Sequence, residues 1–295
     1  TESLKWVLDR DFSKVAAEEV IGLASPLLAE VVNYGTTVFA RCRESARGEL
    51  NEDVAPLYLY LHVVEMADGV QVLVAQCCPT PALLLVRSAF EAMISLKYIV
   101  QGDYVRRSLS WLFDYARDRE AKYDILDPKS SRGKSLRASL ESEGVDIRLP
   151  SAESVAAAAT PIRSFAQRDQ FDEVRAECDK CRKRMHGRRP PWYALFGGPA
   201  SLELLAQEVG VDSLYQILYR GWSTVTHAQD VSRFITKLPS GQSAVNPLRD
   251  PLEVAHVTSL AVSVATDAMR VLLGHFRPDE TVFAKWYRDE VSERY

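Results

Sequence analysis

The chain has 295 residues, enough for one large domain or two. With 47% hydrophobic and 26% charged residues it has the composition of a globular protein, and its net charge of −4 argues against a generally basic nucleic-acid-coating protein, although a local basic groove is compatible with it. No apolar run reaches the roughly 20 residues of a membrane span. The first residues lack a secretory pattern and the five cysteines are odd in number, so we expect a cytoplasmic protein without a disulfide framework.

The first half of the chain predicts four helices. Alanine, leucine, glutamate and arginine are abundant throughout, and no alternating strand pattern is present. Thr80 followed by Pro81 is a helix-start signal, and Gly102-Asp103 is a stop signal. The predicted helices cover residues 11–43 with a kink or break at Pro26, residues 54–77, a helix from Thr80-Pro81 to about residue 101, and residues 104–126.

In the second half of the chain, a segment that predicts mainly loop precedes further helices. Residues 127–150 predict a loop around a short helix, and residues 187–199 and 238–250 predict loops rich in proline and glycine. Further helices are expected over residues 151–186 with a break near Pro161, 201–208, 213–234, 251–276 and 279–295. We therefore predict a single all-α domain over residues 1–295, a multi-helix bundle in which about 128–200 forms a basic, loop-containing elaboration.

One predicted helix face combines a cation, hydroxyls and an imidazole. Arg220 and His227 are seven residues apart, close to two helical turns, and the hydroxyls of Ser223 and Thr224 lie between them. A guanidinium can hold a phosphate by two hydrogen bonds, and an imidazole can transfer protons near neutral pH. This combination is what metal-free cleavage of RNA requires. The alternative interpretation is that His227 is a structural histidine that caps a helix or packs in the core, because the spacing would then be the same.

A second polar pair lies in the most apolar helix. Arg87 and Glu91 are four residues apart, on one face of a segment that is apolar almost all round and therefore predicted to be central to the bundle. Burial of charges is costly unless they are paired. The pair is either a structural ion pair, or Glu91 orients Arg87 or the imidazole of His227 in a polar pocket.

A basic run precedes a pair of aromatic residues in the middle of the chain. Such a run is usually a solvated face, but its density and the adjoining rings also fit contacts to an RNA backbone with base stacking. The candidate RNA-binding residues are Lys180, Arg182, Lys183, Arg184, Arg188, Arg189 and Trp192.

Other site classes have little support in the sequence. Cys178 and Cys181 form a single C-x-x-C, with His186 five residues beyond the second cysteine, but a structural zinc site needs a fourth ligand and usually a second close pair. We interpret them as cysteines on adjacent helix turns. Neither a phosphate-binding glycine loop nor a nucleophile elbow is found, and we expect no metal and no cofactor.

The motifs resemble two groups of known proteins. Arg87-Ser88-Ala89-Phe90-Glu91 and the later Tyr219-Arg220…Ser223…His227 block are similar, in the same order, to signatures of an uncharacterised all-helical bacterial family. The Arg220–His227 spacing also resembles the Arg-x4-6-His motif of the HEPN superfamily, although active members often have Asn, Asp or His where this chain has Gly221.

The HEPN resemblance implies a fold and an activity. HEPN proteins are all-α bundles, usually homodimers, and many are metal-independent endoribonucleases of toxin–antitoxin or antiphage systems. By this resemblance Arg220, His227, Glu91, Arg87 and Ser223 are the expected catalytic residues, RNA is the expected substrate, and an antitoxin or defence-system protein is the expected partner. Other members keep the fold without activity, so the alternative is a non-catalytic helical interaction or sensor module of a bacterial defence system, whose Arg/Glu/His cluster is structural or binds an anion.

Overall fold

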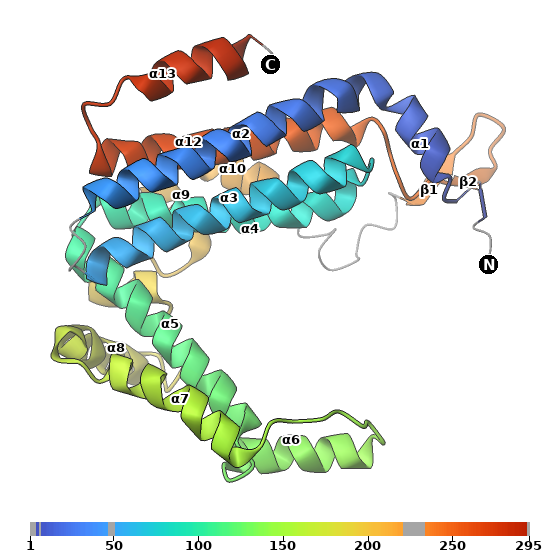
Figure 1. Ribbon diagram of the computed structural model, residues 1–295. Helices are drawn as coiled ribbons and strands as arrows, with labels where there is room; N and C mark the ends of the chain where they lie inside the picture. Colours follow the sequence, from blue (N-terminus) through green and yellow to red (C-terminus); the bar gives the residue numbers. More distant parts are fainter. Residues whose placement is uncertain (1–3, 6, 47–50, 221–233, 294–295) are drawn as a thin grey trace. The chain divides into compact units, whose positions relative to one another are not determined.

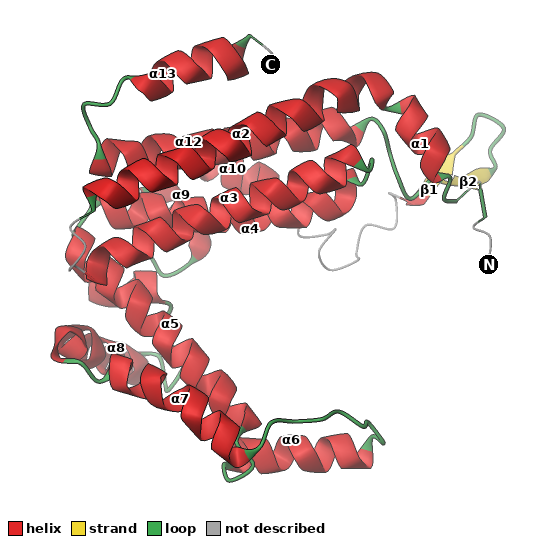
Figure 2. Cartoon of the chain, in the orientation of Figure 1, coloured by secondary structure: helices red, strands yellow, loops and turns green. Residues whose placement is uncertain are grey.

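The computed structural model describes residues 4–5, 7–46, 51–220 and 234–293. The described chain is predominantly helical, which confirms the all-α prediction (Figures 1 and 2). Residue contacts divide it into two compact units: unit 1 comprises Thr1–Gly102 and Glu203–Tyr295, and unit 2 comprises Asp103–Leu202. Unit 2 therefore begins before residue 128, where the predicted elaboration begins, and includes one more long helix.

Unit 1 is built around four long helices that pack side by side (Figure 1). α4 (Pro79–Gln101) packs against α3 (Val54–Ala75) and α12 (Glu253–Phe276), and its side chains at Phe90, Met93 and Ile94 are fully buried. Burial on several sides explains why this helix is apolar almost all round. The N-terminal helices and the long C-terminal helix of this unit are α1 (Arg10–Ala16), α2 (Glu18–Ser45), η1 (Asn51–Asp53), α3 (Val54–Ala75), α4 (Pro79–Gln101) and α12 (Glu253–Phe276).

A glycine allows three of these helices to approach closely. A Cβ at Gly35 of α2 would lie 3.2 Å from Val64 Cγ2 of α3 and 3.3 Å from Met269 Cε of α12. The buried Tyr60 hydroxyl donates a hydrogen bond of 2.9 Å to the Gly35 carbonyl oxygen. The close packing of these three helices therefore depends on a glycine, which has no side chain, at this crossing.

The helices are not broken at either of the two prolines. Pro26 lies inside α2 and Pro161 lies inside α7 (Ala152–Ala166), whereas the chain breaks at Ala17 and again after Gln167. A proline inside a helix costs about 3 kcal/mol. In α2, packing against α3 and α12 outweighs that cost. In addition, α4 begins at Pro79, slightly before the predicted Thr80-Pro81 start.

Unit 2 has its own small aromatic core. Phe171 is fully buried, with its ring centroid 5.0 Å from that of Phe165 and 5.9 Å from that of Phe113. These rings join α5 to α7 and to the turn that precedes α8. The elements of unit 2 are α5 (Tyr104–Leu126), α6 (Ser131–Ser142), α7, η2 (Asp169–Phe171), α8 (Asp172–Arg184) and η3 (Trp192–Gly197).

The remaining elements of unit 1 are short. The helix predicted over residues 213–234 is described only to residue 220, as α10 (Asp212–Leu214) followed by the π-helical η4 (Tyr215–Arg220). The other elements are α9 (Leu202–Glu208), β1 (Ile235–Lys237), β2 (Ser243–Val245), α13 (Val282–Trp286) and the π-helical η6 (Tyr287–Ser292).

A β-hairpin replaces part of the loop predicted at residues 238–250. β1 and β2 pair antiparallel, with Ile235 opposite Val245, and Gly241 in the turn has a φ of +82° that favours glycine. Three residues per strand are too few to produce an alternating pattern that can be recognised in the sequence.

The sequence analysis expected no segment long and apolar enough for a membrane span, but two helices among the described residues meet that criterion by length and composition. They are α3 and α12, in which 39% and 61% of the most apolar window is buried. Both contact α2, α4 and each other in the bundle core. This packing is consistent with a soluble protein, in which core helices have the same composition.

Candidate functional site

The predicted pair between Arg87 and Glu91 is formed on one face of α4. Arg87 Nε donates to Glu91 Oε1 over 3.2 Å. The Arg87 side chain is 17% exposed and that of Glu91 is 42% exposed, so the pair lies at the edge of the bundle. The helical spacing accounts for it because residues i and i+4 lie on one face.

The Arg87 guanidinium also connects α4 to η4. Its Cζ lies 3.9 Å from the ring centroid of Tyr219, and that ring stacks on Tyr215 at 4.9 Å. A guanidinium over an aromatic face gains cation–π attraction. Tyr219 directly precedes Arg220. The fold therefore brings the Arg87–Glu91 motif to the start of the Arg220–His227 block, although the two are far apart in sequence.

The other residues of the predicted catalytic set belong to the end of η4 and to the part of the chain beyond it. Ser223 and His227 lie outside the described residues, as does the Arg220 side chain. What the structure places is thus Arg87, Glu91 and the backbone of η4 up to Arg220.

A polar group that the sequence analysis missed lies beside this motif. His62 Nε2 of α3 is 2.8 Å from Ser88 Oγ of α4, and His62 Nδ1 is 3.8 Å from Glu65 Oε2. The His62 side chain is 33% exposed, so the imidazole is reachable by solvent. Because His62 and Ser88 belong to different helices, no sequence spacing identifies the contact.

The basic run of unit 2 is partly neutralised. Lys180 and Arg184 both pair with Glu177, at 3.2 and 3.3 Å. Arg189 pairs with Asp114 at 2.6 Å, and Arg182 Nε donates to the Gly187 carbonyl oxygen. Burial raises the pKa of Glu177, but hydrogen bonds from Cys181 and Lys180 and the nearby charges lower it overall.

Two exposed cations and one buried ring complete this region. Lys183 and Arg188 are exposed and form no ion pair within the described part of the chain. Trp192 is only 9% exposed and makes an edge contact with Tyr193. The prediction of Trp192 as a free base-stacking ring is therefore wrong, since η3 packs against α5 and α8 and its indole is buried.

The two cysteines of the C-x-x-C contact charged residues of unit 2. Arg117 Nη1 donates to Cys178 Sγ, while Cys181 Sγ donates to Glu177 Oε1 over 3.2 Å and accepts from Arg184 over 2.8 Å. Burial is the main cause of a raised pKa in both thiols. Among the described residues, no group of three His, Cys, Asp or Glu side chains is placed to hold a metal ion.

These environments predict which thiol reacts. Burial raises the pKa of Cys42 to about 12 and also raises the pKa of Cys77, so both stay protonated at neutral pH, where the thiolate is the reactive form. Cys78 is half-buried and borders solvent. We expect a fluorescent maleimide to label Cys78 first in the native protein, and Cys78→Ser to remove the fast phase. Equally fast labelling of Cys42 would contradict this picture.

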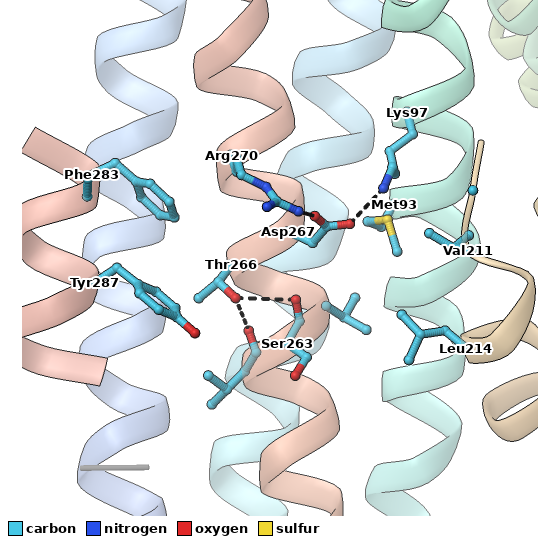
Figure 3. A pocket seen from close by; sticks show the side chains of 14 residues that line it. Met93, Lys97, Val211, Leu214, Ser263, Thr266, Asp267, Arg270, Phe283 and Tyr287 are labelled. Carbon is cyan, nitrogen blue, oxygen red and sulfur yellow. Dashed lines mark hydrogen bonds and ion pairs between the residues drawn. The ribbon is translucent and has the colours of Figure 1, made fainter. Parts of the chain in front are cut away.

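Unit 1 also contains a pocket of about 720 Å³ that the sequence analysis did not anticipate (Figure 3). Lys97 of α4 and Asp267 of α12 form an ion pair of 3.1 Å in its wall. Arg270 pairs with the other oxygen of the same carboxylate. The contact between Asp267 and Arg270 follows a helical spacing of three residues. The contact between Lys97 and Asp267 joins two helices that are far apart in the sequence, so no spacing indicates it.

Comparison with known proteins places the chain in a family. A family model described as "Family of unknown function (DUF5677)" matches residues 53–242. No curated protein and no solved structure matches the chain. The matched range includes the Arg87–Glu91 motif, Tyr219 and the residues that follow, and it confirms the expectation of an uncharacterised family. The chain therefore belongs to the DUF5677 family.

Proposed function

We propose that the protein is a metal-independent endoribonuclease whose site combines Arg87 and Glu91 with Arg220 and His227. The observation that carries the proposal is the position of the Arg87 guanidinium, which pairs with Glu91 and lies 3.9 Å from the Tyr219 ring centroid, one residue before Arg220. Arg87 therefore contacts the residue that directly precedes Arg220 in the chain, and guanidinium groups are suited to bind phosphate.

The proposed reaction needs a base, an acid and positive charge. The 2′-hydroxyl oxygen attacks the adjacent phosphorus, its proton passes to a base, and the 5′-oxygen leaves after it accepts a proton from an acid. His227 takes one of these roles, and Arg220 stabilises the additional negative charge of the transition state. His62, held by Ser88 next to Arg87, is a candidate for the other proton transfer.

The biological setting in this proposal follows the HEPN resemblance. The bundle of unit 1 would be a HEPN-like core, two copies would form a homodimer with their sites adjacent, and the RNase would serve as a cytoplasmic toxin or antiphage effector controlled by a partner protein. In unit 2, Lys183 and Arg188 would add contacts to RNA phosphates, because both are exposed and form no ion pair within the described residues.

The test is RNA cleavage in the presence of EDTA. We expect the wild type to release products with 2′,3′-cyclic phosphate and 5′-hydroxyl ends, and His227→Ala to lower the rate by roughly 10²–10⁴-fold, the usual contribution of a general acid or base. His256→Ala, at an exposed histidine of α12, is the matched control and should keep full activity. In cells, only the wild type and the control should fragment total RNA and slow growth.

A non-catalytic module is the second candidate. The position of Arg87 also favours this candidate. Its guanidinium pairs with Glu91 and stacks on Tyr219, and such contacts can form an internal network that fixes the register of the helices. Absence of cleavage by both the wild type and His227→Ala, with both folded, would support this candidate and contradict the ribonuclease proposal.

A further inference from the structure

The pocket of unit 1 is bounded by four parts of the chain. Its lining residues come from α4, from α12, from the segment around α10, and from α13 with the start of η6. In Figure 3, Phe283 and Tyr287 face Asp267 from one side, and Lys97 and Met93 lie on the opposite side. Its volume of about 720 Å³ is within the range of roughly 300–1,000 Å³ that holds small organic ligands.

Contacts outside the pocket hold its α13 wall in place. The Trp286 ring stacks on Tyr34 of α2 at 3.9 Å, and its Nε1 donates to Glu30 Oε1 over 2.8 Å. Before α13, the nearly buried Glu280 carboxylate pairs with Arg41 of α2 and with Arg277, each at 2.7 Å. The pocket is therefore preformed by packing and ion pairs of the bundle.

The pocket wall has an excess of positive charge. Lys97 and Asp267 are 12% and 15% exposed, whereas the Arg270 side chain is 71% exposed at the mouth. Two cations share one carboxylate, and Asp267 is the single acid among the described lining residues. The lining thus has a net charge of +1, and Arg270 can donate further hydrogen bonds to an anion.

The rest of the lining is mainly apolar. The Thr266 hydroxyl donates to the Val262 carbonyl oxygen over 2.7 Å, so its hydrogen-bond donor is already used within α12. Phe283 and the partly exposed Tyr287 offer aromatic surface on the α13 side. The remaining apolar lining comes from α4, α12 and the segment around α10, namely Met93, Val211, Leu214, Val262 and Val264.

We propose that this pocket binds a small organic anion, with its carboxylate, sulfonate or phosphate on Arg270 and Lys97 and its apolar body against Phe283 and Leu214. The site is separate from the proposed ribonuclease residues, none of which lines the pocket among those described. A ligand with one charge and an apolar body matches both the excess cation and the apolar walls.

The test uses two aromatic probes that differ in charge. Anilinonaphthalene sulfonate is a fluorescent organic anion, and N-phenyl-1-naphthylamine has the same aromatic body without the sulfonate. We expect one saturable site for the anion on the 295-residue chain. Arg270→Ala should weaken anion binding by about tenfold, the usual effect of losing a charged hydrogen bond, and leave the uncharged probe unchanged.

Controls separate the pocket from other apolar surface. Ala284→Trp adds bulk at an exposed position of the pocket wall and should abolish binding of both probes, whereas Ala40→Trp on exposed α2 surface should not. Arg43→Ala, at an exposed arginine of α2, should leave anion binding intact. Binding that survives Ala284→Trp, or equal weakening by Arg270→Ala and Arg43→Ala, would overturn the proposal.

Competition identifies the anionic group. Octanoate and octyl phosphate should displace the fluorescent anion, and octanol should do so far more weakly. If octanoate displaces the probe at lower concentration than octyl phosphate, a carboxylate is the preferred group, and the reverse order indicates a phosphate ester. Equal displacement by octanol would show that charge has no role and would contradict the proposal.

Discussion

Arg87→Lys is expected to lower the rate of RNA cleavage by about a hundredfold while the protein stays folded. Arg87 Nε contacts Glu91, and its planar guanidinium lies over the Tyr219 ring. Lysine keeps the positive charge but cannot bind a phosphate through a planar fork or stack in the same way. The measurement is kcat/KM for RNA, with the urea midpoint of unfolding recorded for the same samples.

The exposed Arg43 of α2 provides the matched control. Arg43→Lys makes the same chemical change on the bundle surface and should leave the rate of cleavage unaltered. Full activity of Arg87→Lys would show that the charge alone is sufficient and would remove the guanidinium from the proposed site. A large loss of stability with unchanged kcat/KM would assign Arg87 a structural role.

Phe90→Ala is expected to destabilise unit 1 by about 3–5 kcal/mol, the usual cost when a buried aromatic side chain is removed. Phe90 is fully buried in α4, which packs on α3 and α12. The loss combines the transfer free energy of the ring with the free energy of the cavity left behind. Urea denaturation gives the magnitude, and hydrogen exchange shows whether the loss is confined to the helices of unit 1.

Leu84 of α4 is the control that tests whether any apolar truncation in this helix destabilises unit 1 as much as Phe90→Ala does. Its side chain is 43% exposed, so Leu84→Ala should change the free energy of unfolding by only about 0.5 kcal/mol. Similar losses for both variants would mean that α4 is not the central helix that its burial indicates.

Local patterns predicted most of the helices. The predicted helix over 104–126 agrees with α5, and the Asp103 side chain caps it by accepting from the Arg106 backbone amide. The Arg87–Glu91 pair follows from a spacing within one helix. Such features depend on neighbours within one or two turns, so the residues themselves contain the information. At Pro26 the predicted alternative of a helix break did not occur, because packing of α2 outweighs the local preference of proline there.

The polar groups between helices were not predictable in this way. The His62–Ser88 and Lys97–Asp267 contacts each join two helices, and a helical period says nothing about which neighbour a face will meet. The burial of Trp192 similarly depends on η3 packing against α5 and α8. In each case the partner comes from another segment of the chain.

The sequence alone determined that this protein is helical, which helix is central, and which Arg, Glu and His residues are candidates for chemistry. Only the tertiary structure decided that Arg87 lies over Tyr219, that the basic run is partly paired, and that α4, α12 and α13 enclose a pocket. The physical reason is range: helix propensity and periodicity act within a few residues, whereas ion pairs and pockets arise from packing between segments far apart in the chain.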